Sequence, residues 1–518
     1  MSEPSIIETS PVDGRELGTY AEATAGEVQD AVARGRRAFQ AWRKRPVNER
    51  LRSLRQLRSA IVERLDEVVE RVVATTGKPD LDALTGDVYT VLDFIAYHEQ
   101  HAAEVLARES RPGHLLSPRS EFAVQYEPLG VIGVLSPWNY PLQLAMLPMV
   151  TALAAGSVVV LKPSEVTPSI GVLIAELCAD AALPEHVVQV VQGGPAVGQA
   201  LVAARPDKVF FTGSVSTGKK IMAAAAAHLT PIELELGGKD PMLVFADAPF
   251  ERAVNAATYG AFVNAGQACI SVERVYVERP LYERFVAATT EAALALRVGT
   301  GRNVELGPII RAEQCSVIER HLDDALAKGA RLTTPRARQG RQFGPLVLRD
   351  VNHEMLVMTE ETFGPVLPIM PFESEADGIR LANDSIYGLN ASVWTKDRER
   401  GRRVASELVT GSCAINDVLK NVANPRLPFG GERQSGLGRY HGPEGLRAFS
   451  RTKAVMHHHG NARAEMNWFP YRPSSYEIVK SSMIALFSDE SAISKAGTIA
   501  DQWLGSALGL LGRKGEKS

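Results

Sequence analysis

The chain has 518 residues, of which 45% are hydrophobic and 23% are charged, and its formal net charge is −3. This length predicts two or three domains, and the small net charge excludes a strong basic field for nucleic acid or for an anionic membrane. No apolar signal sequence and no run of 18 apolar residues is present, so we expect neither secretion nor a spanning helix, and a cytoplasmic location by default.

The first hundred residues predict an amphipathic helical layer. Thr24 and Glu27 have the spacing of a capping box, which opens the first helix. Apolar residues recur three or four positions apart over residues 48–76, and a third helix is expected over residues 81–107. No residue of this layer is a candidate for a chemical role.

From residue 122 the pattern changes to short β-branched runs that alternate with helical ones. The expected strands are residues 131–135, 157–161, 187–191 and 208–211. Strands that alternate with helices predict a parallel sheet, and such sheets bind ligands at the carboxyl ends of their strands. The segments to examine are therefore residues 137–139, 162–165 and 212–214.

The second half repeats this alternation, with strands expected at residues 242–245, 274–277, 391–394 and 412–415. We therefore predict an α/β protein with a second parallel-sheet domain, which carries Cys269. A glycine-rich turn region follows at residues 429–438, and residues beyond about 456 form an appendage.

Cys269 lies among small residues at a break between a helix-like and a strand-like run. A thiolate at such a break can act as a nucleophile, although most free cysteines are small buried hydrophobes. The other cysteines, Cys178, Cys315 and Cys413, form no CxxC pair and are expected to be inert. This spacing argues against a disulfide framework or a zinc site and for a reducing compartment.

The segment from Gly213 to Lys220 fits the pattern GxxxxGK of a phosphate-binding loop. The next position should be Ser or Thr to hold magnesium and is Lys220, and the turn comes late in the sheet, which disfavours an NTPase. A glycine-rich turn before a helix can still hold a pyrophosphate, which suits a dinucleotide. The usual GxGxxG fingerprint is absent.

Several polar residues have both a catalytic and an ordinary interpretation. Glu233 and Glu235 alternate onto one face of a strand, and the glycines that follow leave room for Glu235 to activate a water, but solvated carboxylates are the usual case. Asn139 can donate to an oxyanion or can be a turn residue. Lys162 and Glu165 can hold a ribose or can belong to a surface turn.

Two further segments are candidates for ligand binding. Glu361 and Phe363 form a loop with an acid and an aromatic ring, or the approach to a strand. His457, His458 and His459 can ligate a metal in principle. They lack i, i+4 spacing and nearby acidic partners in the sequence, so we expect them to be exposed and expect no metal site.

Together these pieces resemble the aldehyde dehydrogenase superfamily over about residues 11–453. The matching motifs, in chain order, are Pro137-Trp-Asn-Tyr-Pro141, Lys162-Pro-Ser-Glu165, Phe211-Thr-Gly-Ser214 with Gly218, Glu235-Leu-Gly-Gly-Lys239, Gly266-Gln-Ala-Cys269, Glu361-Thr-Phe-Gly-Pro365 and Pro428-Phe-Gly-Gly431 through Ser435-Gly436. Each piece alone is weak, but seven pieces in the family's order are highly specific.

The resemblance implies NAD(P)-dependent oxidation of an aldehyde to the acid. Cys269 would attack the carbonyl, the Asn139 amide and the Cys269 backbone N–H would hold the oxyanion, and Glu235 would activate the water that releases the acid from a thioester. The implied cofactor contacts are Trp138, Lys162, Glu165, Gly213, Ser214, Gly218, Gly237, Glu361 and Phe363. No metal is implied.

Cofactor and substrate are less constrained. A carboxylate at Glu165 accepts from a ribose 2′-OH and repels a 2′-phosphate, which favours NAD, with NADP as the alternative. Parts of the chain look like a bacterial succinate-semialdehyde dehydrogenase branch, which tends to have Ser at position 165, and others resemble the fatty and aromatic aldehyde branch. Arg274 and Arg426 are the candidate cations for a substrate carboxylate.

The family's organisation implies two Rossmann-type parallel-sheet domains and a small oligomerisation hairpin. Residues 1–115 and 131–238 would bind NAD, residues 239–433 would form the catalytic domain, and residues 116–130 and 434–457 would join subunits into a homodimer or homotetramer. Residues 458–518 form a helical extension with two apolar stripes, which can pack on protein or contact a membrane surface.

Two other functions compete within the family. An acylating dehydrogenase would pass the thioester to coenzyme A, and the presence of Glu235 argues against it. A catalytically idle structural member is the second, and the presence of Cys269, Glu235 and Asn139 argues against that.

Overall fold

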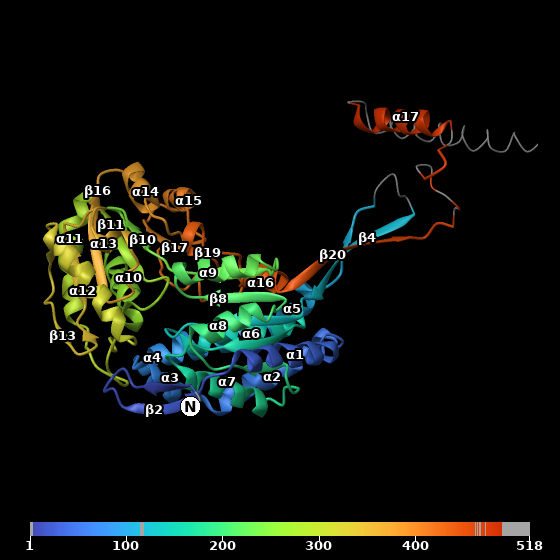
Figure 1. Ribbon diagram of the computed structural model, residues 1–518. Coiled ribbons are helices and arrows are strands. Elements are labelled where there is room, and N and C mark those ends of the chain that lie inside the picture. Colours follow the sequence, from blue (N-terminus) through green and yellow to red (C-terminus); the bar gives the residue numbers. More distant parts are fainter. Residues whose placement is uncertain are drawn as a thin grey trace, which may run out of the picture. The chain divides into compact units, whose positions relative to one another are not determined.

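The computed structural model describes residues 4–113, 119–461, 463, 465, 468–471 and 473–488 (Figure 1). Its contacts divide the chain into two compact units, one made of Met1–Glu109 with Val124–Ala454 and the other of Ser110–Ala123 with Val455–Ser518. The larger unit contains both main sheets and the candidate site. None of the helices in the described residues has the length and apolar content to cross a bilayer.

In the described residues, the first main sheet has six strands in the order β19-β9-β8-β5-β6-β7. These strands are β5 (Val131–Leu135), β6 (Val158–Lys162), β7 (Val188–Val190), β8 (Lys208–Thr212), β9 (Ile232–Glu235) and β19 (Gly436–Leu437). Strands β5 to β9 pair in parallel, and β19 runs antiparallel to β9 with Gly436 opposite Glu235. The expected parallel sheet is confirmed.

A helix follows each of the parallel strands β5, β6, β7 and β8 and returns the chain to the start of the next strand. These helices are α6 (Pro141–Ala155), α7 (Pro168–Asp180), α8 (Pro195–Ala203) and α9 (Val215–Ala226). Every residue of α6 except Gln143 is buried, as expected for a helix that is apolar on all sides. This helix lies between the sheet and α5 (Thr90–Val105), so its N-terminus is fixed by the core.

The N-terminal layer begins with a hairpin of β1 (Ser5–Thr9) and β2 (Glu16–Ala21), which the sequence patterns did not predict. Helix α1 (Ala25–Trp42) follows, and the predicted capping box is confirmed, because the side chain of Thr24 accepts from the backbone N–H of Glu27 and the Glu27 carboxylate accepts from that of Thr24.

The single helix expected over residues 48–76 is two helices, α2 (Val47–Glu63) and α3 (Leu65–Thr76). The break is at Arg64, whose guanidinium pairs with Glu67, Glu176 and Asp180. The expected third helix comprises α4 (Asp80–Asp82), a π-helical segment (Ala83–Tyr89) and α5.

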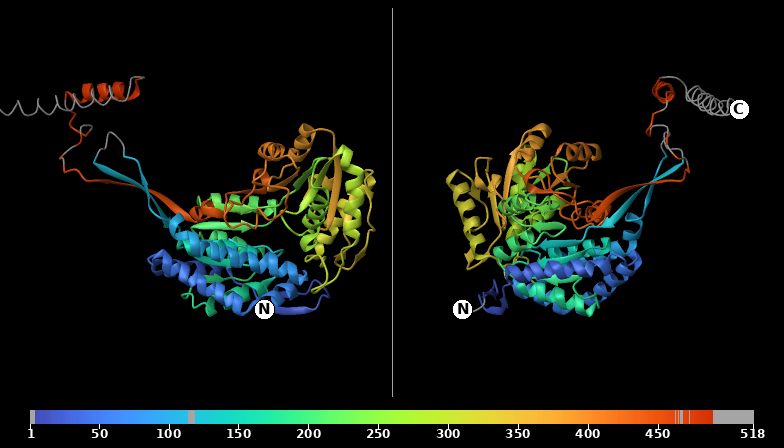
Figure 2. Two further views of the ribbon diagram at one scale, coloured as in Figure 1. Left: turned by 180° about the vertical axis from the view of Figure 1, so that it is seen from behind. Right: turned by 45° about the vertical axis from the view of Figure 1, so that its right-hand side comes forward.

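The second main sheet has seven strands in the described residues, in the order β12-β15-β16-β11-β10-β17-β18. The strands are β10 (Asp240–Val244), β11 (Val272–Glu278), β12 (Arg331–Leu332), β15 (Leu346–Arg349), β16 (Val366–Phe372), β17 (Asn390–Trp394) and β18 (Ser412–Ile415), and only the pairing of β12 with β15 is antiparallel. The helices are α10 (Phe250–Phe262), α11 (Tyr282–Leu294), α12 (Ala312–Ala327), α13 (Leu356–Thr359), α14 (Glu375–Asn383) and α15 (Arg398–Glu407). In Figure 2 the yellow elements of this region gather around the second sheet, and the blue N-terminal helices gather at the first.

Side-chain alternation along the central strands divides the core of this half into two layers. Met242 and Val244 of β10 belong to one buried cluster and Leu243 to another. Successive residues of a strand point to opposite faces, so both faces of the sheet are covered. The predicted fold class, two parallel-sheet α/β halves, is confirmed.

A small antiparallel sheet consists of β3 (Glu109–Arg111), β4 (Ser120–Pro128) and β20 (Ser450–His458), in the order β20-β4-β3. The segments expected to join subunits therefore contain strands, while the domain boundaries and the subunit contact stay predictions. Helix α17 (Ser475–Phe487) belongs to the smaller unit. The remaining short elements are β13 (Arg338–Gln339), β14 (Gln342–Phe343), α16 (Gly442–Ala448) and 3₁₀ turns at Val263–Gly266, Arg279–Leu281 and Arg433–Ser435.

Candidate active site

Glu235 is the last residue of β9 and is only 3% exposed. Neither of its carboxylate oxygens has a hydrogen-bond partner among the described residues. Burial raises the pKa of Glu235 well above the usual value, and the negative charge of Glu233 raises it further, while Arg439 acts in the opposite direction. A buried carboxyl group with unused acceptors and a raised pKa can hold a water and take a proton from it near neutral pH.

Cys269 lies in the turn between α10 and β11, where the sequence predicts a break. The chain enters this turn through Asn264 and Ala265, which have left-handed φ angles of 52° and 54°. Asn264 is held there by several hydrogen bonds; among them, its Nδ2 donates to the carbonyl of Gln267 (3.1 Å) and its backbone N–H donates to Asp82 (2.9 Å). The strained turn is therefore fixed by its own side chain and by the N-terminal layer.

The Cys269 side chain is half-buried among carboxyl groups. Burial raises the pKa of Cys269 above that of an ordinary thiol, and the charges of Asp240, Glu361 and Glu235 raise it further. The residue therefore rests as a thiol at neutral pH and needs a proton acceptor before it can attack. The charge of Glu235 acts on the pKa of Cys269, so the predicted base and the predicted nucleophile belong to one site.

Asn139 follows β5 and is buried against the cysteine turn. Its side-chain Nδ2 donates to the backbone carbonyl of Gln267 (3.0 Å). Its backbone carbonyl accepts from Nδ2 of Asn264 (3.0 Å) and from Nζ of Lys78 (2.8 Å). An amide nitrogen carries two hydrogens, so one is left to donate to an oxyanion. The three predicted catalytic residues thus belong to one connected site.

The N-terminal layer, for which no chemical role is predicted, holds the loop of Asn139 in position through one ion pair. Lys78 and Asp87 form a fully buried ion pair (2.7 Å). Lys78 also donates to Asn139, and the other oxygen of Asp87 accepts the backbone N–H groups of Leu142 and Gln143 at the start of α6. The pair fixes the loop of Asn139 to a helix N-terminus. Charged residues are common in this amphipathic layer, so nothing in the sequence singles out this pair.

The loop at Glu361 approaches the turn after β9. Glu361 accepts the backbone N–H of Gly238 (3.1 Å), and burial together with the charge of Glu273 raises its pKa to about 8. Glu273 in turn accepts the backbone N–H groups of Thr362 (2.8 Å) and Phe363 (2.9 Å). The buried carboxylate of Glu273 therefore sets the position of this loop.

Phe363 and Trp138 meet at this loop, although they are far apart in the sequence. Their ring centroids are 5.5 Å apart in an edge-to-face arrangement, and Phe363 has a left-handed φ of 48°. A Cβ at Gly237 would lie 2.3 Å from the Glu361 carboxylate, so glycine lets this carboxylate lie against the turn. Four of the predicted cofactor residues are thus close to one another.

Lys162 and Glu165 follow the carboxyl end of β6, and Nζ of Lys162 lies 3.0 Å from the carboxylate. Burial alone would raise the pKa of Glu165, but the charge of Lys162, hydrogen bonds to the carboxylate and the charge of Arg311 together outweigh burial, and the net pKa is lowered. Glu165 is therefore ionised at neutral pH. An ammonium and a carboxylate side by side at a strand end suit the hydroxyls of a ribose.

The turn from β8 into α9 contains the glycine-rich segment. The Ser214 hydroxyl caps α9 by accepting from the N–H of Thr217. A Cβ at Gly218 would lie 2.6 Å from Leu236, so glycine lets the helix lie close to the end of β9. A helix N-terminus at the carboxyl edge of a parallel sheet fits a pyrophosphate, so the donor set suits a dinucleotide.

The two candidate cations for a substrate carboxylate differ in burial and in hydrogen bonding. Arg274 is 1% exposed and donates to the carbonyls of Lys239 (2.8 Å) and Ala382 (2.9 Å), among other backbone acceptors, and to the Tyr276 hydroxyl. This guanidinium is committed to the fold, and its nomination as a substrate ligand was wrong. Arg426 is exposed, with its guanidinium 5.8 Å from the ring centroid of Tyr97.

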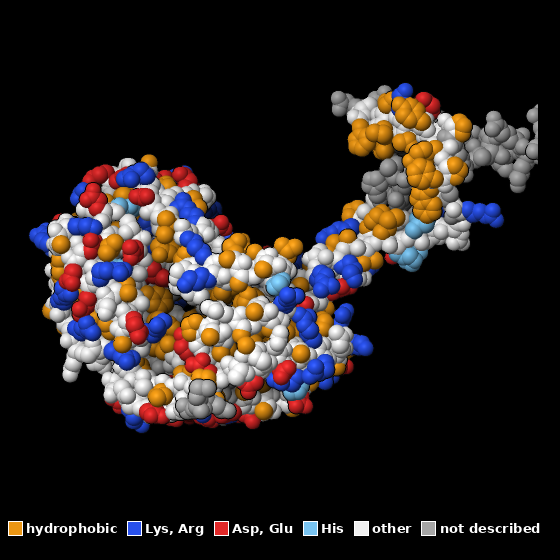
Figure 3. Space-filling view, viewed as in Figure 1, with side chains coloured by type: hydrophobic (Ala, Val, Ile, Leu, Met, Phe, Trp, Pro, Cys, Tyr) orange, Lys and Arg blue, Asp and Glu red, His pale blue; other side chains and the backbone are white. Residues whose placement is uncertain are grey.

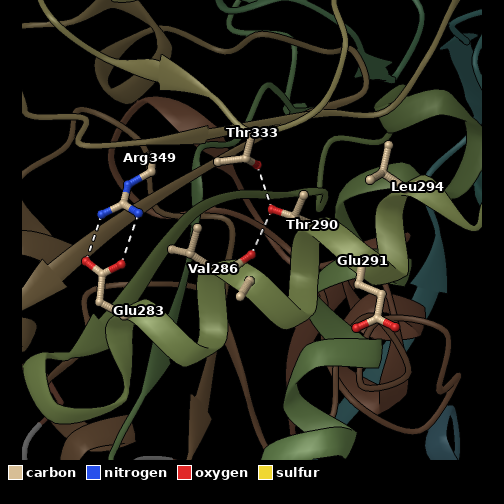
Figure 4. Close-up of a pocket in the computed structure, with 8 residues that line it drawn as sticks. Glu283, Val286, Thr290, Glu291, Leu294, Thr333 and Arg349 are labelled. Carbon is tan, nitrogen blue, oxygen red and sulfur yellow. Dashed lines mark hydrogen bonds and ion pairs between the residues drawn. The ribbon is translucent and has the colours of Figure 1, made fainter.

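A surface hollow on the second half lies away from the predicted residues (Figure 4). Two polar pairs of its lining are internal, because Arg349 binds Glu283 through two contacts (2.7 and 3.0 Å) and the hydroxyls of Thr290 and Thr333 lie 2.6 Å apart. None of the predicted site residues lines it, so it is not the candidate site.

The other three cysteines lie in structural elements, as expected. Cys178 is buried in α7, Cys315 in α12, and Cys413 is half-buried in β18. Burial raises the pKa of Cys178 and of Cys413 to about 12, which keeps both as thiols. Cys269 is the cysteine placed among polar groups of the site.

Comparison with known proteins agrees with this geometry. The profile of the aldehyde dehydrogenase family matches residues 2–455. A 4,4'-diapolycopene aldehyde oxidase of Methylomonas sp is 44% identical over 492 residues, which cover 95% of this chain and 93% of that one. A Mycolicibacterium smegmatis protein provisionally named succinate-semialdehyde dehydrogenase [NADP(+)] is 37% identical, over 85% of this chain and 86% of that one.

Solved structures show the same fold. The crystal structure of a Mycobacterium tuberculosis aldehyde dehydrogenase complexed with NAD+ superposes with a TM-score of 0.85 at 35% identity, over 89% of this chain and 96% of that one. The chain spans nearly the whole length of these relatives, and it carries a cysteine, a carboxylate and an asparagine in one site. It belongs to the aldehyde dehydrogenase family and is an enzyme of that family.

Proposed function

We propose that this enzyme oxidises an aldehyde to its carboxylic acid, with Cys269 as the nucleophile, Glu235 as the general base and Asn139 as an oxyanion donor. The buried carboxylate of Glu235, with neither oxygen bonded within the described residues, carries the proposal. A base that activates water distinguishes acid formation from transfer of the acyl group to coenzyme A.

The proposed reaction has three steps at this chain's residues. The Cys269 sulfur adds to the aldehyde carbon, its proton passes to a base, and the oxyanion is held by the Asn139 amide and the Cys269 backbone N–H. NAD(P)+ supplies the acceptor for the hydride that leaves the hemithioacetal, so that a thioester remains. Glu235 then takes a proton from water, the water adds to the thioester, and the acid leaves as the thiol is restored.

We infer that NAD+ is preferred over NADP+. The carboxylate of Glu165 accepts hydrogen bonds from a 2′-hydroxyl and repels a 2′-phosphate. Its lowered pKa supports this preference, because the group is charged at working pH. Trp138, Lys162, Gly213, Ser214, Gly218, Gly237, Glu361 and Phe363 complete the proposed cofactor contacts.

For the substrate we propose a long apolar aldehyde. The Methylomonas relative is named for a 4,4'-diapolycopene aldehyde, and its match includes most of the C-terminal extension. The described extension exposes large apolar side chains: Trp468, Phe469, Tyr471, Tyr476, Met483, Ile484 and Phe487. The stripe expected on α17 is therefore present, while the second expected stripe (residues 499–511) lies outside the described residues.

Such a surface supports peripheral contact with a lipid bilayer, where a long apolar aldehyde would reside. Flotation of the full chain and of a truncation at Met466 with liposomes tests this, and equal flotation would contradict it. We also propose a homodimer or homotetramer whose subunits join through β4 and β20. We propose a cytoplasmic location, because four free cysteines suit a reducing compartment.

Succinate semialdehyde is the second candidate. The exposed guanidinium of Arg426 could pair with a distal carboxylate, and the Mycolicibacterium relative is named for this substrate. Arg274 cannot serve, since its donors are used by the fold.

A panel of aldehydes tests the proposed function. Purified enzyme and the Cys269→Ser variant are assayed for NADH or NADPH formation with succinate semialdehyde, aliphatic aldehydes of rising length, polyene dialdehydes and benzaldehydes. We expect cysteine-dependent turnover with NAD+, fastest for long apolar substrates. Turnover that survives the Cys269→Ser change, or none on any aldehyde, would contradict the proposal.

A further inference from the structure

His457 and His458 end β20 and His459 follows directly, and the extended backbone divides the three side chains between two faces. Successive strand side chains point to opposite sides, so His457 and His459 share a face and His458 points away. The ring centroids of His457 and His459 are 4.1 Å apart, and both side chains are exposed. Two imidazoles are thus presented side by side to solvent, and histidine side chains are visible as pale blue surface in the smaller unit (Figure 3).

Folding supplies the acidic partner that the sequence did not reveal. Glu121 comes from β4, and its carboxylate lies 3.1 Å from Nε2 of His459. The expectation that these histidines have no acidic neighbour was therefore wrong, because the partner is more than 300 residues away in the chain. One ligand atom from each of Glu121, His457 and His459 lies within 4.8 Å of the other two.

We propose that Glu121, His457 and His459 form a binding site for a divalent transition metal such as Zn²⁺. Two imidazoles and one carboxylate are a ligand set that zinc favours, with water as a fourth ligand, at bond lengths of about 2.0–2.2 Å. Tetrahedral ligands at these lengths lie about 3.3–3.5 Å apart, and exposed side chains can close to this distance by small rotations. Imidazole and carboxylate also suit Ni²⁺ and Cu²⁺, which makes both useful probes.

The backbone holds two of the ligands in place. The backbone N–H of His459 donates to the carbonyl of Arg119 (2.8 Å), so the end of β20 is tied to the start of β4 beside Glu121. A metal would therefore bridge two neighbouring strands of the smaller unit, whose residues are far apart in the sequence. Ligands on paired strands lose less freedom on binding than ligands on a loop.

His458 provides a matched control on the same strand. It faces the other side, where its Nδ1 lies 2.9 Å from the Ser120 hydroxyl and its Nε2 lies 3.3 Å from Glu465. Replacing it removes one histidine from the same tripeptide without removing a proposed ligand. A site that depends on geometry, and not on histidine content, must distinguish it from His457.

Calorimetric titration of the full-length protein with ZnCl₂ and with NiCl₂ tests the site. All variants carry Cys269→Ser, so that the reactive thiol cannot bind the metal. We expect one equivalent of metal, bound at least about tenfold more weakly by His457→Ala and by Glu121→Gln, because loss of a ligand should cost no less than loss of an outer-shell partner. His458→Ala should bind like its parent.

Spectroscopy provides a second readout that does not depend on activity. One equivalent of Cu²⁺ should give an electron paramagnetic resonance spectrum with nitrogen hyperfine splitting, which is lost in a His457→Ala, His459→Ala double variant. Equal affinity of parent and double variant, or an equal loss in His458→Ala, would overturn the proposal. The substituted residues are exposed, so unchanged circular dichroism is expected and confirms that each variant is folded.

Discussion

The backbone carbonyl of Cys269 lies where a side chain at position 238 would begin: a Cβ added to Gly238 would be 2.2 Å from that oxygen. Real Cβ atoms do not approach an oxygen so closely, so any side chain at position 238 must displace the cysteine turn or the strand before it. Gly238, three residues after the proposed base, therefore lets the segment after β9 lie close to the cysteine turn.

Gly238→Ala is accordingly expected to lower kcat by roughly 10²-fold, the usual cost of displacing a reacting group by about 1 Å. Overpacking should also lower the free energy of unfolding by about 1–3 kcal/mol. Steady-state rates and urea unfolding measure the two effects. An alanine variant with wild-type kcat would contradict the close approach.

Gly26→Ala is the matched control. Gly26 is exposed in the first turn of α1, and the atom nearest to an added Cβ is 3.8 Å away. Alanine there should leave kcat unchanged and raise stability by up to about 1 kcal/mol, since alanine is the better helix former.

The Glu361 carboxyl should control the reactivity of Cys269 in a pH-dependent way. The pKa of Glu361 is raised to about 8, so it is charged above pH 8 and mostly neutral at pH 7. When charged it raises the pKa of Cys269. Glu361→Gln removes that charge, lowers the pKa of the thiol and increases the thiolate fraction at pH 9, so iodoacetamide should modify Cys269 several-fold faster at pH 9 and at nearly the same rate at pH 7.

Glu360→Gln controls for loss of a neighbouring acid. Glu360 pairs with Arg320 and His321, whereas the carboxyl groups that raise the pKa of Cys269 are Asp240, Glu361 and Glu235. Its variant should be alkylated like wild type at both pH values, as followed by mass spectrometry of the peptide that contains Cys269. Equal acceleration in both variants would mean that overall charge, and not proximity, governs the thiol.

Local patterns predicted the parts of the fold that local chemistry decides. The β-branched runs and the glycine turns mark the central strands, and the site motifs lie at their ends because parallel sheets place loops there. Cys269, Glu235 and Asn139 could be named because each belongs to a short contiguous motif.

Features decided by distant residues could not be predicted. The apolar period continues past Arg64, but the helix breaks there, where Arg64 meets Glu176 and Asp180, more than 110 residues further along the chain. Lys78 and Asp87 are only nine residues apart in the sequence, yet the role of their ion pair in holding the loop depends on the more distant Asn139 and α6. In each case the sequence shows the charged residues but not which of them contact one another in the fold.

Glu165→Ser is expected to shift cofactor choice toward NADP+. Loss of the carboxylate removes the repulsion of a 2′-phosphate and frees the ammonium of Lys162 to bind it. The ratio of kcat/KM for NADP+ to that for NAD+ should rise at least about tenfold, equivalent to about 1.4 kcal/mol. Glu185→Gln, an exposed acid elsewhere on the same half, should leave the ratio unchanged. A constant ratio in Glu165→Ser would remove Glu165 from the specificity argument.

The two arginines should respond in opposite ways to substitution. Arg274→Met leaves several buried carbonyls without a donor, so the free energy of unfolding should fall by at least about 3 kcal/mol. Arg426→Ala removes an exposed side chain and should change stability by less than about 0.5 kcal/mol. If succinate semialdehyde is the substrate, Arg426→Ala raises KM for it and not for hexanal; an unchanged KM excludes this arginine as the carboxylate ligand.

Glu235→Gln separates the two halves of the proposed reaction. The glutamine keeps the shape of the side chain but cannot take a proton, so thioester formation should proceed while its hydrolysis slows by about 10²–10⁴-fold, the usual contribution of a general base. Rapid mixing should show a burst of nearly one NADH per subunit followed by slow turnover, and intact mass spectrometry should detect the acylated chain.

In wild type, hydrolysis should be lost as pH falls through the raised pKa of Glu235, because protonation removes the base. The acid limb of kcat should therefore lie above the range of an ordinary glutamate. In Glu235→Gln that limb should disappear from the slow phase. A variant without a burst would place Glu235 before hydride transfer, as the base that deprotonates Cys269, and would overturn its assignment to hydrolysis.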